Sequence, residues 1–186
     1  MNDIEEILKR YGVLKRGHFL LTSGLHSEYY FEKFRILEHP ELVSLFANRI
    51  IEKFKDKKID LVCGPTTGGV IIAFEVARQL GKRCIISEKG EKGRVIRRGF
   101  KIREGERVLV VDDVLTTGGS IRETLKSLSP FNPEIVGVAV LIDRTTQPLI
   151  DIPHFSIYKR PVKNYPPEDC PLCKRGVPLE TPGGRG

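Results

Sequence analysis

Short runs of apolar residues without polar alternation recur along the chain. A run of this kind is typical of a strand that is buried on both faces, as strands are inside a parallel sheet. The most distinct is residues 108–111, Val-Leu-Val-Val, which ends on two acidic residues. Others cover residues 59–63, 83–87 and 135–142, and a shorter one lies within 150–158. We expect these segments to be the strands of one mainly parallel sheet.

Segments with helical spacing lie before and between these runs. Ile4, Ile7 and Leu8 form one stripe after a capping Asp3, and a longer stripe starts at Pro40. Further helices are predicted at residues 70–80, where Gly81 follows, and from Ser120 onward, where Ser120 and Glu123 have the spacing of a capping box. The alternation of strands and helices predicts an α/β fold, with helices flanking an open, mainly parallel twisted sheet.

The two ends of the chain have a different pattern. Residues 17–31 are apolar, then polar around Gly24, then aromatic, which indicates a β-hairpin that we call the hood. The tail is rich in proline and glycine, so we expect one short strand followed by irregular chain. We expect a single domain over residues 1–186, with the hood at about 13–36 plus an extension at 150–186, and the core at about 40–149.

Length and composition agree with one globular domain. The chain has 186 residues, of which 40% are hydrophobic, enough for one buried core and too few for two. It has no run of 18 apolar residues, and its start, Met-Asn-Asp-Ile-Glu-Glu, is acidic rather than signal-like. We therefore expect a soluble, cytoplasmic protein with no membrane partner. The formal net charge of +7 favours anionic ligands.

The four cysteines fall into two classes. Cys63 and Cys84 lie in apolar runs and are interpreted as buried core residues, whereas Cys170 and Cys173 form a Cys-x-x-Cys in the tail. That pair is compatible with a metal site, a disulfide or redox pair, or a packed turn. Zinc would need two more ligands, and the four histidines, His18, His26, His39 and His154, offer no second pair at matching spacing. The packed turn is therefore the favoured interpretation.

The segment after residue 111 carries the most specific chemistry. Asp112 and Asp113 are followed by Val114, Leu115 and a loop of small residues, Thr116, Thr117, Gly118, Gly119 and Ser120. The backbone N–H groups of such a loop and the following helix N-terminus suit a phosphate. The acidic pair would repel a phosphate, so it is expected to bind ribose hydroxyls or to hold Mg²⁺ through water. An acidic pair also occurs in metal-binding receiver domains, but there it lies near the start of the chain.

Two further strand ends carry polar residues. A second loop, Thr66-Thr67-Gly68-Gly69, follows the run at 59–63, and Arg144 follows the run at 135–142. Ligands of open parallel sheets bind outside the carboxyl ends of the strands. We therefore expect these two segments and the loop after Asp113 to meet at one edge of the sheet.

A basic segment covers residues 89–103. It holds Lys89, Lys92, Arg94, Arg97, Arg98, Lys101 and Arg103 against one acid, Glu91. Such a run is compatible with a solvated loop, with nucleic-acid binding, or with a mobile clamp for a small polyanion. Because Phe100 is its only aromatic residue, the clamp is favoured and nucleic acid is not expected as a partner.

The run from residue 108 to residue 120 resembles the phosphoribosyl diphosphate (PRPP) loop of type I phosphoribosyltransferases. Residues 23–31, 112–120 and 141–144, in this order, are similar to orotate phosphoribosyltransferases over nearly the full length. Residues 97–100 and the tail Cys-Pro-Leu-Cys-Lys-Arg-Gly-Val-Pro-Leu are similar to a short-chain branch of that family. The resemblance implies the type I phosphoribosyltransferase fold and the reaction of orotate with PRPP and Mg²⁺ to give orotidine 5′-monophosphate and pyrophosphate.

The resemblance also implies roles for individual residues. Asp112, Asp113, Lys89 and Lys92 would be catalytic, with Mg²⁺ held by PRPP and water rather than by direct side-chain ligation. Lys89 and Lys92 lie where the family has a loop that crosses into the neighbouring subunit's site, so a homodimer with shared active sites is expected. Orotate would contact Thr116, Arg144, Tyr30 and Phe31. PRPP would contact Asp112, Asp113, Val114, Leu115, Thr116, Thr117, Gly118, Gly119, Ser120, Thr66, Thr67, Gly68, Lys89, Lys92, Arg97 and Arg98.

The chain departs from the family at two positions. Thr22 and Gly68 stand where many members carry lysine. Either other cations, such as Lys89, Lys92, Arg97 or Arg98, take over those phosphate contacts, or the chain belongs to a sub-branch that never used them. Two rival functions stay open at this point. One is a phosphoribosyltransferase for a purine or for uracil, which would not need Arg144. The other is a PRPP-sensing regulator that binds nucleic acid through the basic segment.

Overall fold

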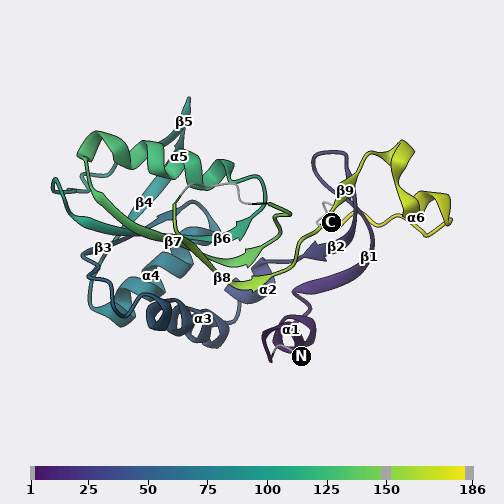
Figure 1. Ribbon diagram of the computed structural model, residues 1–186, viewed down its shortest axis with the longest axis horizontal. Helices are drawn as coiled ribbons and strands as arrows, with labels where there is room; N and C mark the ends of the chain where they lie inside the picture. The colour runs from purple at the N-terminus through teal and green to yellow at the C-terminus, as the bar shows by residue number, and fades with distance from the viewer. Residues whose placement is uncertain (1–2, 148–151, 183–186) are drawn as a thin grey trace.

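The computed structural model describes residues 3–147 and 152–182. In these ranges the strands form one six-stranded sheet and one three-stranded sheet. Figure 1 shows the larger sheet with helices on both of its faces, and the smaller sheet at the opposite end of the molecule. In the described ranges, no helix is long and apolar enough to cross a bilayer.

The six-stranded sheet has the strand order β5-β4-β3-β6-β7-β8. Neighbouring strands pair in parallel, except that β5 runs antiparallel to β4. The predicted mainly parallel α/β sheet is therefore confirmed. The bounds are β3 Leu61–Pro65, β4 Arg83–Gly90, β5 Gly93–Ile96, β6 Arg107–Leu115, β7 Glu134–Asp143 and β8 His154–Lys159.

The predicted long helices are present on the two faces of this sheet. Helices α3 and α4 cover one face and α5 the other (Figure 1). Gly81, with φ of +64°, ends α4 as expected from its tolerance of the left-handed conformation. The long helices are α1 Asp3–Arg10, α3 Pro40–Lys53, α4 Gly68–Leu80 and α5 Gly119–Leu128, and the short ones are α2 Phe34–Leu37, η1 Ser129–Phe131, η2 Pro167–Asp169 and α6 Pro171–Lys174.

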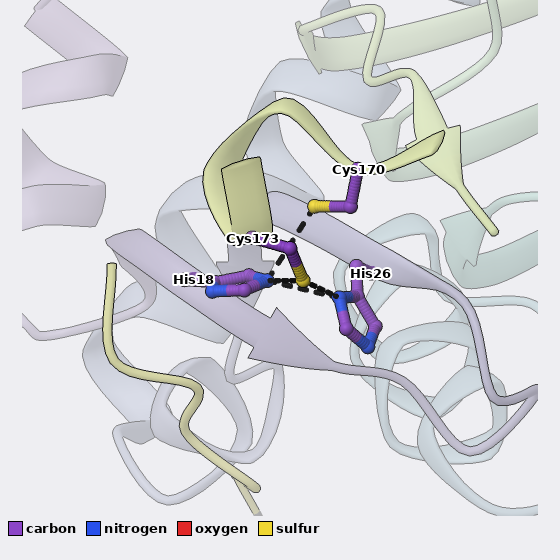
Figure 2. A group of neighbouring side chains, drawn as sticks. All are labelled: His18, His26, Cys170 and Cys173. Atoms are coloured by element: carbon purple, nitrogen blue, oxygen red, sulfur yellow. Dashed lines mark hydrogen bonds between the residues drawn. The ribbon is translucent and has the colours of Figure 1, made fainter. Parts of the chain in front are cut away.

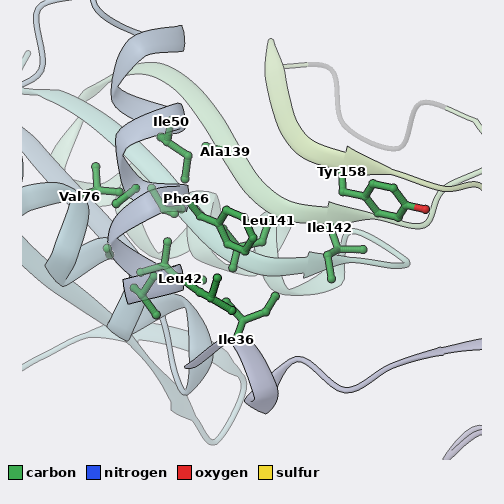
Figure 3. Close-up of a cluster of buried hydrophobic side chains, with 14 of the residues drawn as sticks. Ile36, Leu42, Phe46, Ile50, Val76, Ala139, Leu141, Ile142 and Tyr158 are labelled. Carbon is green, nitrogen blue, oxygen red and sulfur yellow. The ribbon is translucent and has the colours of Figure 1, made fainter. Parts of the chain in front are cut away.

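The central strands are buried on both faces, which explains their continuous apolar sequences. On β6, Leu109 and Val111 belong to the core under α3 and α4, whereas Val108 and Val110 belong to the core under α5. Figure 3 shows the first of these cores, where side chains of α3 and α4 lie against β7. Fully burying one such side chain contributes about 1.5–3 kcal/mol to folding.

The hood is the three-stranded sheet, with strands in the order β1-β2-β9. Strands β1 (Leu14–Leu20) and β2 (His26–Phe31) form the predicted hairpin, and β9 (Asn164–Tyr165) of the tail pairs with β2. The tail is thus more ordered than its composition predicted, because it adds a strand to the hood and one turn of helix, α6.

Three details differ from the sequence predictions. Strand β8 lies inside the range assigned to the hood extension but is the edge strand of the core sheet. Helix α5 begins at Gly119 with Gly118 as its N-cap, so the predicted capping box is wrong. The basic segment opens as the β4–β5 hairpin rather than as a loop. The expected strand start at residue 150 and the tail residues 183–186 lie outside the described residues.

Candidate functional site

The acidic pair lies in the last part of β6, at the carboxyl edge of the sheet. Asp112 and Asp113 are each 5% exposed. The backbone N–H of Asp113 donates to Asp112 Oδ1 at 2.8 Å, and that of Val114 donates to Asp113 Oδ1 at 2.7 Å. Backbone N–H groups at the end of the strand therefore fix the orientation of both carboxylates.

The two carboxylates differ in their electrostatic setting. Burial, and secondly the charge of Asp113, raise the pKa of Asp112 to about 6, although a hydrogen bond from the Asp113 backbone and one from Ser120 act in the other direction. Asp113 has a cationic partner, because Lys33 Nζ lies 2.7 Å from its Oδ2. Lys33 lies two residues after the end of the hood strand β2, and its sequence context gave no reason to assign it to the site.

The loop between β3 and α4 lies directly against the acidic pair. A Cβ atom on Gly68 would lie 2.0 Å from Asp113 Oδ2, closer than any side chain allows. Glycine at this position therefore lets Thr66 and Thr67 lie beside the carboxylates. In this conformation any side chain at position 68, lysine included, would overlap that carboxylate.

Arg94 on β5 joins three elements at this edge. Its guanidinium donates to Thr66 Oγ1 at 3.3 Å, to the Ser87 carbonyl at 3.0 Å and to Ser120 Oγ at 3.2 Å. The side chain is only 7% exposed. In the sequence, Arg94 is one of several basic residues without an assigned role. Only the geometry of the hairpin turns it inward and leaves basic neighbours such as Arg97 and Arg98 outside the site.

These residues surround a hollow of about 400 Å³ that we call the acidic hollow. Most of the predicted site residues meet there, with Lys33 and Arg94 as additions. The lining residues are Phe31, Lys33, Thr66, Thr67, Lys89, Arg94, Asp112, Asp113, Val114, Thr116, Ser120 and Arg144. The expectation that three strand ends converge on one edge is therefore confirmed.

Arg144 is held at the end of β7 by its backbone. Its N–H donates to the Leu115 carbonyl at 3.0 Å, and its carbonyl accepts from Val162 at 3.1 Å. The guanidinium carbon lies 5.3 Å from the Phe31 ring centroid, and Nη2 lies 3.5 Å from Ser27 Oγ. Within the described residues the buried Nε has no hydrogen-bond partner. Burial also lowers the pKa of Arg144, so the side chain is a desolvated cation with an unused donor.

A second hollow of about 320 Å³ adjoins the first and shares Thr116 and Arg144 with it. We call it the outer hollow. Its polar lining suits a small hydrogen-bonding ligand next to whatever occupies the acidic hollow. The remaining lining residues are Thr117, Thr145, Thr146, Gln147, Val162 and Asn164.

Several predicted residues do not line either hollow. Lys92, at the turn of the β4–β5 hairpin, borders a different surface depression with Glu123 and Lys126. Arg98 forms an ion pair with Glu88 at 2.8 Å, and Arg97 donates to the Lys89 carbonyl.

Other predicted residues support the site from behind or from the side. The Tyr30 ring packs 5.7 Å from that of Phe19, and the Leu115 side chain lies in the core under α5. Gly118 and Gly119 form the start of α5, so they offer backbone N–H groups and no side chain.

A family model named phosphoribosyl transferase domain matches residues 35–163 of the chain. This match spans both loops, the acidic pair and Arg144. The chain belongs to this family.

Curated members of the phosphoribosyl transferase family extend the match to nearly the whole chain. An orotate phosphoribosyltransferase of Caldanaerobacter subterraneus is 44% identical, over 97% of this chain and 95% of that protein. One of Thermotoga maritima is 41% identical, over 98% of each chain. The matched regions therefore include the hood and the tail.

Solved structures of the family share the fold. The orotate phosphoribosyltransferase of Aeropyrum pernix superimposes with a TM-score of 0.73 at 27% identity, over 84% of this chain and 93% of that one. An adenine phosphoribosyltransferase of Thermoanaerobacter pseudethanolicus reaches 0.61 at 20% identity, over 71% and 88%. The fold alone therefore does not identify the base, which has to be argued from the site.

Proposed function

We propose that the chain transfers the ribose 5-phosphate group of PRPP to orotate, giving orotidine 5′-monophosphate and pyrophosphate, a step of pyrimidine nucleotide synthesis. The observation that carries the proposal is the position of Arg144, a desolvated cation with a free Nε donor at the border of the acidic hollow. Orotate has a carboxylate that adenine, hypoxanthine and uracil lack. A planar guanidinium suits a carboxylate better than any neutral base edge.

PRPP would occupy the acidic hollow. Asp112 and Asp113 would accept hydrogen bonds from the ribose hydroxyls, and the loop from Thr116 to Ser120, with the N-terminus of α5, would bind the 5′-phosphate. Thr66, Thr67, Lys89 and the two additional cations, Lys33 and Arg94, border the remaining wall, where the diphosphate would lie.

Orotate would occupy the outer hollow, with Arg144 on its carboxylate and Thr116 at the junction with PRPP. Phe31 lies against the guanidinium of Arg144 and lines the acidic hollow, so it would hold the arginine in place and border the pyrimidine ring. Orotate already carries its nucleophilic nitrogen, so holding both reactants side by side would supply much of the rate enhancement. As the glycosidic C–O bond breaks, the carboxylates face the electron-poor ribose ring while the cations face the leaving pyrophosphate.

We propose that Mg²⁺ enters with PRPP, held by the diphosphate and by water beside Asp112 and Asp113. The donor set fits, because Mg²⁺ prefers oxygen ligands and keeps several waters. Two carboxylates with Lys33 on only one oxygen leave acceptor atoms for such waters. Bound there, the ion would take up part of the charge that develops on pyrophosphate.

We further propose a homodimer with shared active sites. Lys92 stands at the tip of the β4–β5 hairpin and outside the acidic hollow of its own chain. A lysine at a hairpin tip is well placed to reach the diphosphate in a neighbouring subunit. A closing hairpin would also keep water away from the ribose cation.

The test is an absorbance assay with PRPP, Mg²⁺ and each of four bases in turn. We expect consumption of orotate with release of pyrophosphate, and no turnover of adenine, hypoxanthine or uracil. Turnover of one of those bases in place of orotate would assign the chain to a different phosphoribosyltransferase activity. No turnover, together with salt-dependent binding of nucleic acid, would favour the regulator.

A further inference from the structure

Two histidines and two cysteines meet on the hood, away from both hollows. Figure 2 shows His18 and His26 on the facing strands of the hairpin, with Cys170 and Cys173 on the tail segment above them. One ligand atom of each residue points to the same place, and these four atoms all lie within 4.8 Å of one another. His18, His26 and Cys170 are buried, and Cys173 is at the surface.

Hydrogen bonding alone does not account for this convergence. His18 Nδ1 donates to the Val177 carbonyl at 2.8 Å, because a carbonyl only accepts. In the neutral ring this leaves Nε2 with one lone pair and no proton. Nε2 nevertheless has three close polar neighbours, His26 Nδ1 at 2.9 Å, Cys170 Sγ at 3.5 Å and Cys173 Sγ at 3.7 Å. One lone pair cannot accept from three donors.

Three of the separations match the edges of a tetrahedron around a metal ion, and all four ligand atoms lie within 4.8 Å of one another. With metal–nitrogen bonds of about 2.0 Å and metal–sulfur bonds of about 2.3 Å, the ligand atoms of a tetrahedral zinc site lie about 3.3–3.8 Å apart. The two sulfur distances from His18 fall in this range, and Cys173 Sγ lies 3.3 Å from His26 Nδ1. The histidine pair, at 2.9 Å, would need to open by a few tenths of an ångström.

The backbone holds the four residues on a rigid frame. His26 opens β2 and pairs with Tyr165 of the tail, and the His18 carbonyl accepts from the N–H of Glu180. Strand β9 and Glu180 thus fix the tail on both sides of the Cys-x-x-Cys turn. The Val177 carbonyl also orients the ring of His18, as an outer partner does for many metal-bound histidines.

We propose that His18 Nε2, His26 Nδ1, Cys170 Sγ and Cys173 Sγ bind one Zn²⁺ ion, which fastens the tail to the hood. All four positions of the tetrahedron come from protein, which indicates a structural rather than a catalytic ion. This proposal would replace the packed turn favoured from the sequence with the metal site that the sequence left as an alternative. His18 and His26 come from opposite strands of a hairpin, so they do not show the short spacing that marks a second ligand pair in a sequence.

The first test is the metal content of the protein, purified without chelator and measured by mass spectrometry of the elements. We expect about one zinc ion per chain, as in closed Cys₂His₂ sites. Cys173→Ser should lose the zinc, and this residue is chosen because its exposure makes the exchange easy to tolerate. Cys84→Ser, which alters a cysteine outside the cluster, should keep it.

The second test needs no variant. Wild-type protein freed of metal and loaded with Co²⁺ should develop thiolate-to-cobalt charge-transfer absorption and the visible bands of a tetrahedral ion. Removing Zn²⁺ with a chelator should lower the midpoint of thermal unfolding by about 5 °C or more, and adding Zn²⁺ back should restore it.

Three results would each overturn the proposal. One is wild-type protein that takes up neither Zn²⁺ nor Co²⁺ after reduction. Another is zinc retained equally by wild type and Cys173→Ser. The third is an intact mass two units low with no metal, which would show a Cys170–Cys173 disulfide in place of the ion. None of these readouts depends on the proposed transferase activity, so the two proposals stand or fall separately.

Discussion

Asp112 lies in surroundings that oppose its charge. Its carboxyl is buried beside a second carboxylate, and the ion pair of Lys33 at this site is with Asp113. A carboxyl group in this setting gains from any ligand that donates hydrogen bonds to it, and ribose hydroxyls do so. The unfavourable setting of the Asp112 carboxylate in the ligand-free site is therefore consistent with the proposed binding of a sugar there.

The raised pKa of Asp112 predicts a dependence of stability on pH. Because the pKa rises from 3.8 to about 6 on folding, the folded state keeps a proton that the unfolded chain has released between these values. This contribution favours the folded state at low pH and is lost as the pH rises through about 6. Its size is about 3 kcal/mol at most. Asp112→Asn should therefore be more stable than wild type at pH 7.5, with a smaller advantage at pH 4.

Urea unfolding of the ligand-free protein at these two pH values measures the effect. Comparing the variant with wild type cancels the other carboxylates, such as Asp60, whose pKa is lowered by Arg107. An advantage of the variant that is equal at the two pH values would mean that Asp112 is not the group responsible.

Among the described glycines, Gly68 is the one whose added Cβ would lie closest to a neighbouring atom. Gly68→Ala would place a Cβ against Asp113 Oδ2, so the loop or the carboxylate has to move, at a cost of about 1–3 kcal/mol. We expect lower stability and a higher KM for PRPP. Gly119→Ala is the control for stability, since its Cβ would lie 3.6 Å from the nearest atom, in a helical position. Equal unfolding free energies for the two variants would contradict the close approach.

The next scale is that of the elements, where the β4–β5 hairpin decides which basic residues belong to the site. Arg94 on β5 points into the site, where it donates to Thr66 and Ser120, whereas Arg98 beyond the strand pairs with Glu88 at the surface. Arg94→Gln should reduce kcat/KM for PRPP, with a loss of transition-state stabilisation of about 2–4 kcal/mol. The reason is that a buried cation and its hydrogen bonds to two loops are lost. Lys101→Gln, an exposed change in the same segment, should have little effect. A similar loss in both variants would show that only overall charge matters.

The strand-end rule explains how much of the site could be predicted from sequence. Asp112, Thr66 and Arg144 each follow or end an apolar run, and a parallel sheet brings such positions together whatever the rest of the chain does. Lys33 and Arg94 could not be assigned to the site from the sequence, because their positions depend on how the hood and a hairpin fold over that edge. His18 and His26 could not be assigned to the proposed zinc site for a similar reason, since their partners lie about 150 residues away in the sequence.

At the scale of the whole molecule, we propose that the hood and the core form one domain. Tyr158 on β8 and Arg160 after it both donate to Glu5 of α1, at 2.7 and 2.8 Å. The hood contacts the core sheet as well, because the rings of Phe31 on β2 and Tyr158 on β8 lie 6.4 Å apart and Arg144 lies over the Phe31 ring. Chemical denaturation should show one transition by far-UV circular dichroism and by tyrosine fluorescence, and separate midpoints would indicate two domains.

The proposed shared site predicts complementation between two variants that are each impaired, compared at an orotate concentration below the KM of Arg144→Ala. In a mixed dimer of a Lys92→Ala chain with an Arg144→Ala chain, one of the two sites contains both residues. Random exchange of subunits makes half of the dimers mixed, so about a quarter of the wild-type activity should return. The control is each variant mixed with itself under the same exchange conditions. If no activity returns although mass spectrometry confirms subunit exchange, the proposal that the β4–β5 hairpin reaches into the neighbouring subunit's site is contradicted.

The central claim is that the carboxyl edge of one sheet holds PRPP and an acidic pyrimidine together, with Arg144 as the group that recognises the pyrimidine. The most direct measurement is the KM of Arg144→Ala for each substrate, with Arg16→Ala, an exposed hood arginine paired with Glu28, as control. We expect the KM for orotate to rise by about 2–5 kcal/mol in free energy while the KM for PRPP stays close to wild type. Equal losses for both substrates, or no loss for orotate, would contradict the account.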